Sequence, residues 1–221
     1  MRFVRFYVSL QKKIDKSMKR LIYLAYLAIV AAAVAACSTP EQKAEALIKD
    51  YLQLSLLKPE TYKPVKTILR EANSPYDDLD LLKEVKQLQD IAWEYDLKEA
   101  HIRNAKSRMS LNSGSYQSAF TKNEYKEAKE DYDKATAESE ELKIKGKNLY
   151  EKVVAKLKTN PEMIGYKALH NFRADDNAGN TYIGNVIALF DKDMDRVTYV
   201  FEMEEYDKLQ KYIKEEILKE E

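Results

Sequence analysis

The feature that most constrains the fold is a pair of long amphipathic repeats in the middle of the chain, separated by the turn sequence Ser113-Gly114-Ser115. In both repeats apolar side chains recur every three or four residues, which is the spacing of one face of an α-helix. The first repeat is interrupted only at Glu99 and comprises Leu81, Val85, Leu88, Ala92, Tyr95, Ile102, Ala105 and Met109. The second comprises Tyr125, Ala128, Tyr132, Ala135, Ser139, Leu142, Gly146, Leu149 and Val153. This pattern predicts an antiparallel helical hairpin over residues 79–159.

The second helix of the hairpin has its own start and stop signals. Thr121-x-x-Glu124 has the form of a capping box, and Asn160-Pro161 ends the pattern. A helix from Thr121 to Lys158 would be about 57 Å long at ~1.5 Å per residue. Large and small side chains largely alternate along its apolar face, which allows the two helices to approach closely.

The residues before the hairpin predict one helix and one strand. Thr39-Pro40-Glu41-Gln42 is typical of a capped helix start, and helical spacing of apolar residues continues to about Leu57. Tyr62–Arg70 is β-branched and alternating, so it predicts a strand. Pro64 within it indicates a sheet edge or the start of the strand.

After Pro161 the apolar period changes from helical to two, which predicts strands. One face of the first strand comprises Ile164, Tyr166, Ala168, His170, Phe172 and Ala174. Two further strands, Tyr182–Phe190 and Val197–Met203, follow polar turns and complete a three-stranded antiparallel meander. A final amphipathic helix begins at about Glu204.

The predicted fold class is therefore α+β. It consists of an N-terminal helix and a four-stranded antiparallel sheet, with the helical hairpin inserted and a helix at the C-terminus. Residues 37–78 and 160–221 form a membrane-proximal domain, and residues 79–159 form the coiled-coil-like insertion. Without the insertion the order of elements resembles cystatin-like α+β rolls, a likeness of fold that implies no activity.

The first 37 residues indicate export. Met18-Lys19-Arg20 precedes sixteen uncharged residues, Leu21–Ala36, which are followed by Cys37, the chain's single cysteine. A basic start, an apolar core and small residues before the cut are typical of a signal peptide. The residues at the cut resemble the lipobox of bacterial lipoproteins: Val34, Ala35, Ala36 and Cys37.

The lipobox resemblance implies cleavage after Ala36 and attachment of acyl chains such as palmitate to Cys37. Several acyl chains, at about 0.8 kcal/mol per buried CH₂, would hold the mature domain on a membrane permanently. We expect residues 1–36 to be the signal peptide. Either Met18 is the true start, or residues 1–17 are a basic extension that is lost with the leader.

The formal net charge of zero is an average over two different segments. The first 36 residues contain seven of the 37 basic and one of the 37 acidic side chains, so the remainder carries a net charge of −6. An acidic mature chain argues against a nucleic-acid partner, because such partners require concentrated positive charge. Ser38 is not the acidic residue that marks inner-membrane retention in some Gram-negative lipoproteins. We therefore expect the outer membrane, facing the periplasm.

The C-terminal half carries a second resemblance. Ile164-Gly165-Tyr166-Lys167, His170-x-Phe172-Arg173-Ala174 and Phe190-Asp191-Lys192-Asp193 are similar to a region of small envelope lipoproteins of unassigned function from Gram-negative anaerobes. The order of predicted elements is similar over most of the mature chain, whereas the residues themselves are similar only in this part. It brings no catalytic residue with it.

One motif has the form of a calcium-binding loop. Asp191, Asp193 and Asp195 occupy positions one, three and five of an EF-hand pattern, and Glu202 occupies position twelve. Position six is Arg196, where the sharp turn of such a loop needs glycine, and the residues that follow alternate like a strand. We therefore favour a solvated turn, with calcium as the weaker alternative.

The sequence contains two histidines, His101 and His170, and neither belongs to a recognisable catalytic or metal-binding motif. His170 lies on the apolar face of a predicted strand, where a half-buried structural histidine is the more frequent outcome. There is no nucleophile elbow, zinc-protease motif or phosphate-binding glycine loop. We expect no enzyme activity and no cofactor, and a hydrolase that uses His170 ranks last.

The function we expect is that of a non-enzymatic binding or scaffolding module of the cell envelope. In this hypothesis the hairpin contacts a partner protein through its outer face and its tip, Leu111–Phe120. The alternative is capture of a small apolar or peptide-like ligand in a pocket between the sheet and the first or last helix. The candidate contact residues for a ligand or partner are Tyr116, Tyr166, His170, Phe172 and Arg173.

Overall fold

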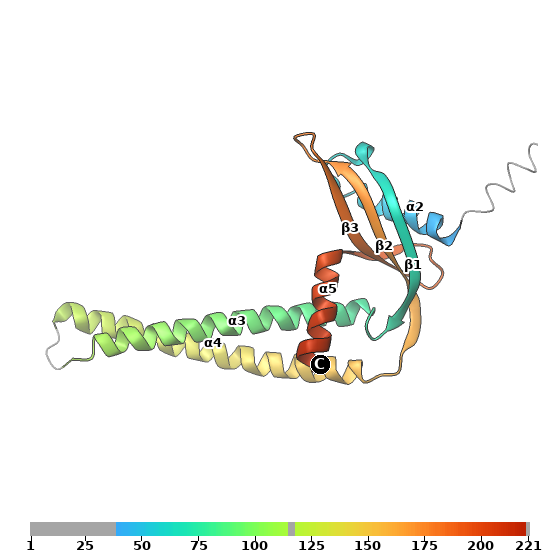
Figure 1. Ribbon diagram of the computed structural model, residues 1–221. Coiled ribbons are helices and arrows are strands. Elements are labelled where there is room, and N and C mark those ends of the chain that lie inside the picture. Colours follow the sequence, from blue (N-terminus) through green and yellow to red (C-terminus); the bar gives the residue numbers. More distant parts are fainter. Residues whose placement is uncertain (1–38, 115–117, 220–221) are drawn as a thin grey trace, which may run out of the picture.

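The fold is described for residues 39–114 and 118–219 of a computed structural model (Figure 1). The predicted signal peptide, its predicted cleavage residues Val34, Ala35 and Ala36, the predicted lipidation residue Cys37, and Tyr116 lie outside these residues. The helices are α2 (Pro40–Leu52), η1 (Pro59–Thr61), α3 (Leu79–Leu111), α4 (Ala119–Leu157) and α5 (Met203–Tyr212) with its continuation η2 (Ile213–Ile217). The strands are β1 (Lys63–Ser74), β2 (Glu162–Asp175), β3 (Thr181–Phe190) and β4 (Val197–Glu202). The predicted α+β fold and its order of elements are confirmed.

Helices α3 and α4 form the predicted antiparallel hairpin, which extends away from the sheet as an arm (Figure 1). With 39 residues, α4 is about 58 Å long at ~1.5 Å per residue. A Cβ atom on Gly146 would lie 3.2 Å from the side chain of Ile91, so the glycine allows close approach of the helices. Glu99, which interrupts the apolar pattern, accepts a 2.9 Å hydrogen bond from Ser139 across the helix pair.

The predicted start of the second hairpin helix is wrong by two residues. Helix α4 begins at Ala119, and Ser118 is its N-cap, accepting a 3.1 Å hydrogen bond from the backbone N–H of Thr121. A serine three residues upstream thus caps the helix in place of the predicted Thr121. Glu124 lies 3.6 Å from the guanidinium of Arg108 on the other helix instead.

The N-terminal helix starts as predicted and ends earlier. Thr39 and Gln42 form a reciprocal capping box at the start of α2. The helix ends at Leu52 rather than near Leu57, where a turn begins in which Ser55 donates a hydrogen bond to the carbonyl of Leu52. Leu54 is 92% exposed, so apolar spacing continues beyond the last residue that α2 can bury against the sheet.

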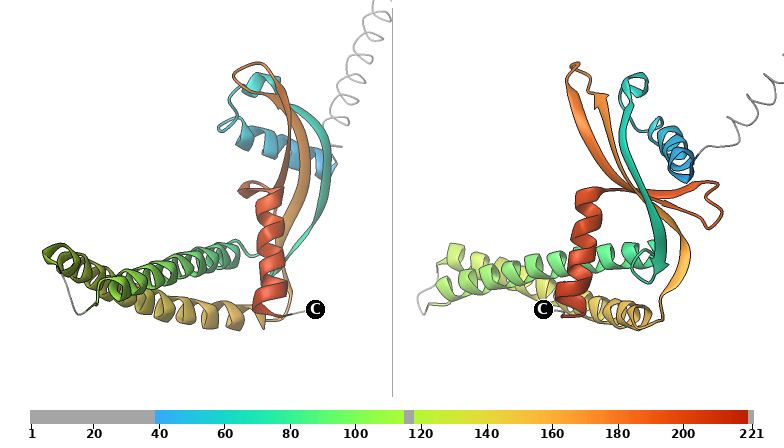
Figure 2. Two further views of the ribbon diagram at one scale, coloured as in Figure 1. Left: turned by 60° about the vertical axis from the view of Figure 1, so that its left-hand side comes forward. Right: turned by 45° about the vertical axis from the view of Figure 1, so that its right-hand side comes forward.

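The sheet has the strand order β1-β2-β3-β4, and all neighbouring strands are antiparallel. Pro64 lies on the edge strand β1, as predicted, next to a bulge between Pro64 and Lys66. Strand β1 continues to Ser74, beyond the predicted end at Arg70. Figure 2 shows that the strands curve, with the hairpin at one end of the sheet and α2 packed against one face.

Alternate residues of the same strands fill two separate cores on the two faces of the sheet. The core against α2 comprises Ala44, Ile48, Leu52, Tyr62, Ala168, Phe172, Ala174, Val186, Ala188, Phe190 and Met194. The other core, which we name the joint core, comprises Leu81, Leu82, Val85, Leu88, Val153, Leu157, Ile187, Leu189, Phe201, Tyr206, Leu209, Ile213 and Ile217.

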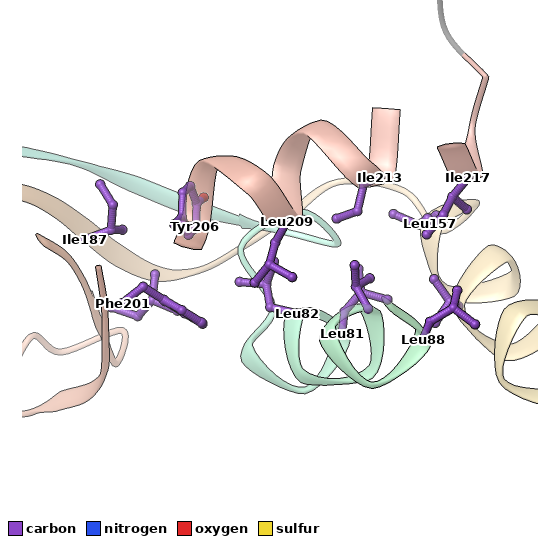
Figure 3. Close-up of a cluster of buried hydrophobic side chains, with 13 residues drawn as sticks. Leu81, Leu82, Leu88, Leu157, Ile187, Phe201, Tyr206, Leu209, Ile213 and Ile217 are labelled. Atoms are coloured by element: carbon purple, nitrogen blue, oxygen red, sulfur yellow. The ribbon is translucent and has the colours of Figure 1, made fainter. Parts of the chain in front are cut away.

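The joint core connects the hairpin with the sheet through α5. Figure 3 shows Leu209 and Ile213 of the C-terminal helix directed at Leu81 and Leu82 of α3. Ile217 reaches the α4 side of the hairpin, where it lies near Leu157. The root of the arm is therefore packed in the same core as one face of the sheet.

A buried carboxylate reinforces this joint. Asp77, 4% exposed, accepts hydrogen bonds from Lys167 of β2 at 2.7 Å, from the backbone N–H of Asn73 at 2.8 Å, and from the hydroxyl of Tyr206. Burial, and then the hydrogen bond to Asp77, raise the pKa of Tyr206 above its ordinary value, so this hydroxyl keeps its proton. One carboxylate thus connects β1, β2 and α5. A charged group in a buried position requires such partners.

Candidate functional site

A hollow in the surface of the α+β domain lies where β4 is shorter than β3. Their pairing ends with Val186 opposite Glu202, and the chain turns into α5 at Met203. Residues 181–185 of β3, which we name the open edge, therefore have β2 on one side and no neighbouring strand on the other within the described residues.

A groove of about 1040 Å³ lies against the open edge. Its walls come from the end of α2 and the turn after it, from β2, β3 and β4, and from α5. The lining side chains include Tyr51, Leu56, Phe172, Tyr182, Met203 and Lys211. It lies between the sheet and the first and last helices, which is where the ligand-capture alternative expects a pocket.

The aromatic lining of the groove is held in place by a glycine. Phe172 of β2 lies opposite Gly184 of β3, and a Cβ atom on this glycine would come within 2.2 Å of the Phe172 ring. The ring therefore lies across β3 in the space that a side chain would occupy. Tyr182 packs edge-on against it, with the ring centroids 6.3 Å apart.

The groove has an acidic end beside α5. Lys208 pairs with Glu204 at 2.7 Å and Lys211 pairs with Glu215 at 3.7 Å, so these two charges are compensated within the helix. Glu202 and Asp207, which also line the groove, have no ion-pair partner among the described residues. This end can therefore attract a positively charged group.

Next to Phe172, a chain of hydrogen bonds runs through His170. The His170 side chain is fully buried; its Nε2 atom lies 2.7 Å from the hydroxyl of Tyr62 and its Nδ1 atom 2.9 Å from that of Thr67. Thr67 donates its one hydroxyl proton to Glu45 of α2 at 3.1 Å. Thr67 must then accept from Nδ1–H, so Nε2 is left to accept from Tyr62.

The surroundings of this chain keep both rings neutral. Burial lowers the pKa of His170 below its ordinary value, and the nearby Glu45 carboxylate offsets part of this effect. Burial, with a smaller contribution from Glu45, raises the pKa of Tyr62. Because both imidazole nitrogens are engaged, His170 is not available as a general base toward a bound substrate. Its ring stacks on Phe172 at 5.9 Å and so supports the groove lining.

The predicted contact residues are only partly brought together. Phe172 lines the groove and His170 lies behind it. Tyr166 is half-buried against the core under α2. Arg173 is exposed and, as the neighbour of Phe172 on a strand, points to the other face of the sheet. Tyr116 lies outside the described residues.

The sequence predicted a pocket between the sheet and the first or last helix but named none of its lining residues on β3 or α5. The unequal predicted lengths of the last two strands, Tyr182–Phe190 and Val197–Met203, were the available signal. Unequal lengths show that some residues lack a partner. Which residues these are depends on register, which is set by three-dimensional packing.

The acidic residues between β3 and β4 form a turn with its own hydrogen bonds and ion pairs. The Asp191 carboxylate accepts from the backbone N–H of Asp195 at 2.8 Å and pairs with Arg196 at 3.2 Å, while Asp195 pairs with Lys43 at 3.0 Å. Strand β4 carries Glu202 away from this turn, about 17 Å from its start at ~3.3 Å per residue. In the described residues no group of three or more His, Cys, Asp or Glu side chains, Asp193 included, is placed to hold a metal ion.

Comparison of the chain with models of protein families, with curated proteins and with solved structures found no match. Within residues 39–114 and 118–219, no helix is both long enough and apolar enough to cross a membrane.

The hydrogen-bond chain predicts a pH dependence of stability. Unfolded histidine has a pKa of about 6.5, whereas burial lowers that of folded His170. As pH falls through about 6.5, the unfolded chain takes up a proton that the folded chain resists, so the free energy of unfolding decreases. Urea denaturation between about pH 7.5 and 5.5 should show this decrease, and His170→Gln should reduce its slope.

The control is His101→Gln, which removes the other histidine from an exposed position on α3. This variant should keep the slope of the unaltered protein. Equal slopes for the His170→Gln variant and the unaltered protein would contradict the assignment.

Proposed function

We propose that the protein is a lipid-anchored, non-enzymatic binding module of the cell envelope whose helical hairpin contacts a partner protein. The observation that carries the proposal is at the far end of the arm. Leu111, the last residue of α3, is 84% exposed, and Phe120, in the first turn of α4, is 72% exposed. Large apolar side chains that the described part of the chain leaves exposed at the end of an arm are suited to insertion into a partner.

The construction of the arm supports this role. Close to the tip, Arg108 of α3 pairs with Asp131 at 2.7 Å, and further along Lys98 pairs with Glu138 at 2.6 Å. Such exposed pairs contribute little free energy individually, but they connect the two helices at defined positions. With its root in the joint core, the arm holds its tip at a fixed place away from the sheet (Figure 2).

The beginning of α2 supports the membrane-proximal placement of the α+β domain. The capped helix starts at Pro40, three residues after the proposed lipidation site Cys37. Such a short connection keeps the sheet close to the lipid headgroups, and the arm then reaches away from the sheet. We place the anchor in the outer membrane, facing the periplasm.

A second candidate function is capture of a ligand in the groove. It is favoured by one observation, the aromatic lining that Gly184 and His170 hold in a defined position. A lining that is already ordered loses little side-chain entropy on binding. The hydrolase alternative is not carried further, because both ring nitrogens of His170 are engaged in its buried hydrogen bonds.

The lipid anchor is tested by Cys37→Ser. Expressed from Met1 in a Gram-negative host, the unaltered chain should be found in the membrane fraction and should incorporate radiolabelled palmitate. The variant should incorporate none and should leave the membrane fraction, because its anchor is lost. Retention of the variant in the membrane at the level of the unaltered chain would contradict the proposal.

The hairpin contact is tested by the double variant Leu111→Ser/Phe120→Ser. One apolar anchor in an interface contributes about 2 kcal/mol, so loss of two should reduce in-cell crosslinking to the partner at least about tenfold. Both residues are exposed, so the circular dichroism spectrum and the unfolding midpoint should change little.

Ile144→Ser is the matched control, because Ile144 is also exposed, at 62%, but lies on the shaft of α4. Crosslinks should persist in this variant. The tip would be excluded as the contact if the double variant retained its crosslinks, or if Ile144→Ser lost them to the same degree.

A further inference from the structure

We infer that the open edge of β3 binds an extended peptide segment of a partner protein, which adds to the sheet as a strand in line with β4. The inference deepens the second proposed function, ligand capture by the groove, and is independent of the hairpin. The juxtaposition that carries it is an unpaired half-strand beside a groove, with an apolar lining on one side and uncompensated acids at one end.

The backbone of the open edge offers the hydrogen-bonding groups. Strand β4 satisfies this side of β3 only from Val186 to Phe190. Between Thr181 and Asn185, alternate residues direct an N–H and a C=O toward the groove, and a neighbouring strand is the natural partner of such groups. An added strand lies about 4.8 Å from β3, and five residues of it span about 17 Å.

The open edge differs from the β1 edge of the sheet in how it is protected against strand addition. The β1 edge carries Pro64, Lys66 and Arg70 and has bulges, which are the devices that keep strands from pairing with other chains. The open edge consists of Thr181, Tyr182, Ile183, Gly184 and Asn185, with no charge and no proline. Ile183 is 64% exposed. One edge is protected against strand addition and the other is suited to it.

The surroundings define the chemistry of the peptide. Alternate side chains of an added strand point to opposite faces of the sheet, so one set would lie beside Tyr182 and Leu56. Apolar or β-branched side chains suit this position. At the end beside β4, Glu202 and Asp207 favour a lysine, an arginine or a free amino terminus. The occupant is thus an extended, partly apolar segment with a positive charge at one end.

The test begins with a phage library of random twelve-residue peptides, selected against the full-length protein purified in detergent. The strongest binder is then synthesised with a fluorescent label, and its Kd is measured by anisotropy. Amide hydrogen exchange should show new protection at residues 181–185 and none along β1. Two versions of the peptide are then prepared, each methylated at every second backbone nitrogen, so that hydrogen-bond donors are removed and side chains are kept. In the version whose methylated nitrogens face β3, binding should weaken at least tenfold.

The charge requirement is tested by Glu202→Gln/Asp207→Asn, which should weaken binding of this peptide at least threefold. The matched control is Glu204→Gln, which removes an acid that Lys208 already compensates and should have a smaller effect. Binding that is insensitive to both methylation patterns, protection elsewhere, or selection of no binder would overturn the inference. Protection of the open edge without peptide, in parallel with dimer formation, would also overturn it, because the occupant would then be a second copy.

A small uncharged apolar dye, N-phenyl-1-naphthylamine, separates this inference from the ligand-capture proposal on which it rests. Dye binding that Phe172→Leu reduces, together with failure of every peptide, would leave ligand capture standing and exclude strand addition. Failure of both dye and peptides would exclude both.

Discussion

The apolar face of α5 is the interaction on which the rest of the structure depends. Leu209 and Ile213 are almost wholly buried between the hairpin root and the sheet, and burial of one such side chain contributes about 1.5–3 kcal/mol. Without this helix the arm would be connected to the sheet through the chain segments at its two ends, the Asp77–Lys167 pair and the remaining side chains of the joint core. With it, an elongated hairpin and a small curved sheet share one core (Figure 3).

The same helix also creates the groove. To reach the hairpin root, the chain leaves the sheet at Met203, directly after Glu202, so β4 pairs with only half of β3. The joint and the open edge are therefore two consequences of one change of direction. The arm tip and the open edge, where the two contacts are proposed, belong to one unit held together by the joint core. A partner bound at the tip would therefore have a defined position relative to a partner bound at the open edge.

Local signals predicted the elements, and apart from the ends of α2 and α4 the errors arose where packing between distant elements decides. The Thr39 cap, the helix repeats and the alternating strands are encoded within a few residues, and these were correct. The sequence marked Glu99 as an interruption, although Ser139, forty positions away, makes it part of the helix contact. His170 was expected to be half-buried and is fully buried, and its partners Tyr62 and Thr67 come from another part of the chain. The groove depends on register, which no local pattern specifies.

Native-state hydrogen exchange of a Leu209→Ala variant tests most directly whether hairpin and sheet form one unit. A large-to-small change at a buried leucine costs about 2–5 kcal/mol. If the joint core unites the two parts, protection should fall by the same amount in α3 residues 81–88 and in β3 residues 186–190. Loss of protection in the hairpin root while β3 keeps its full protection would show that arm and sheet are separate units, and would contradict the account.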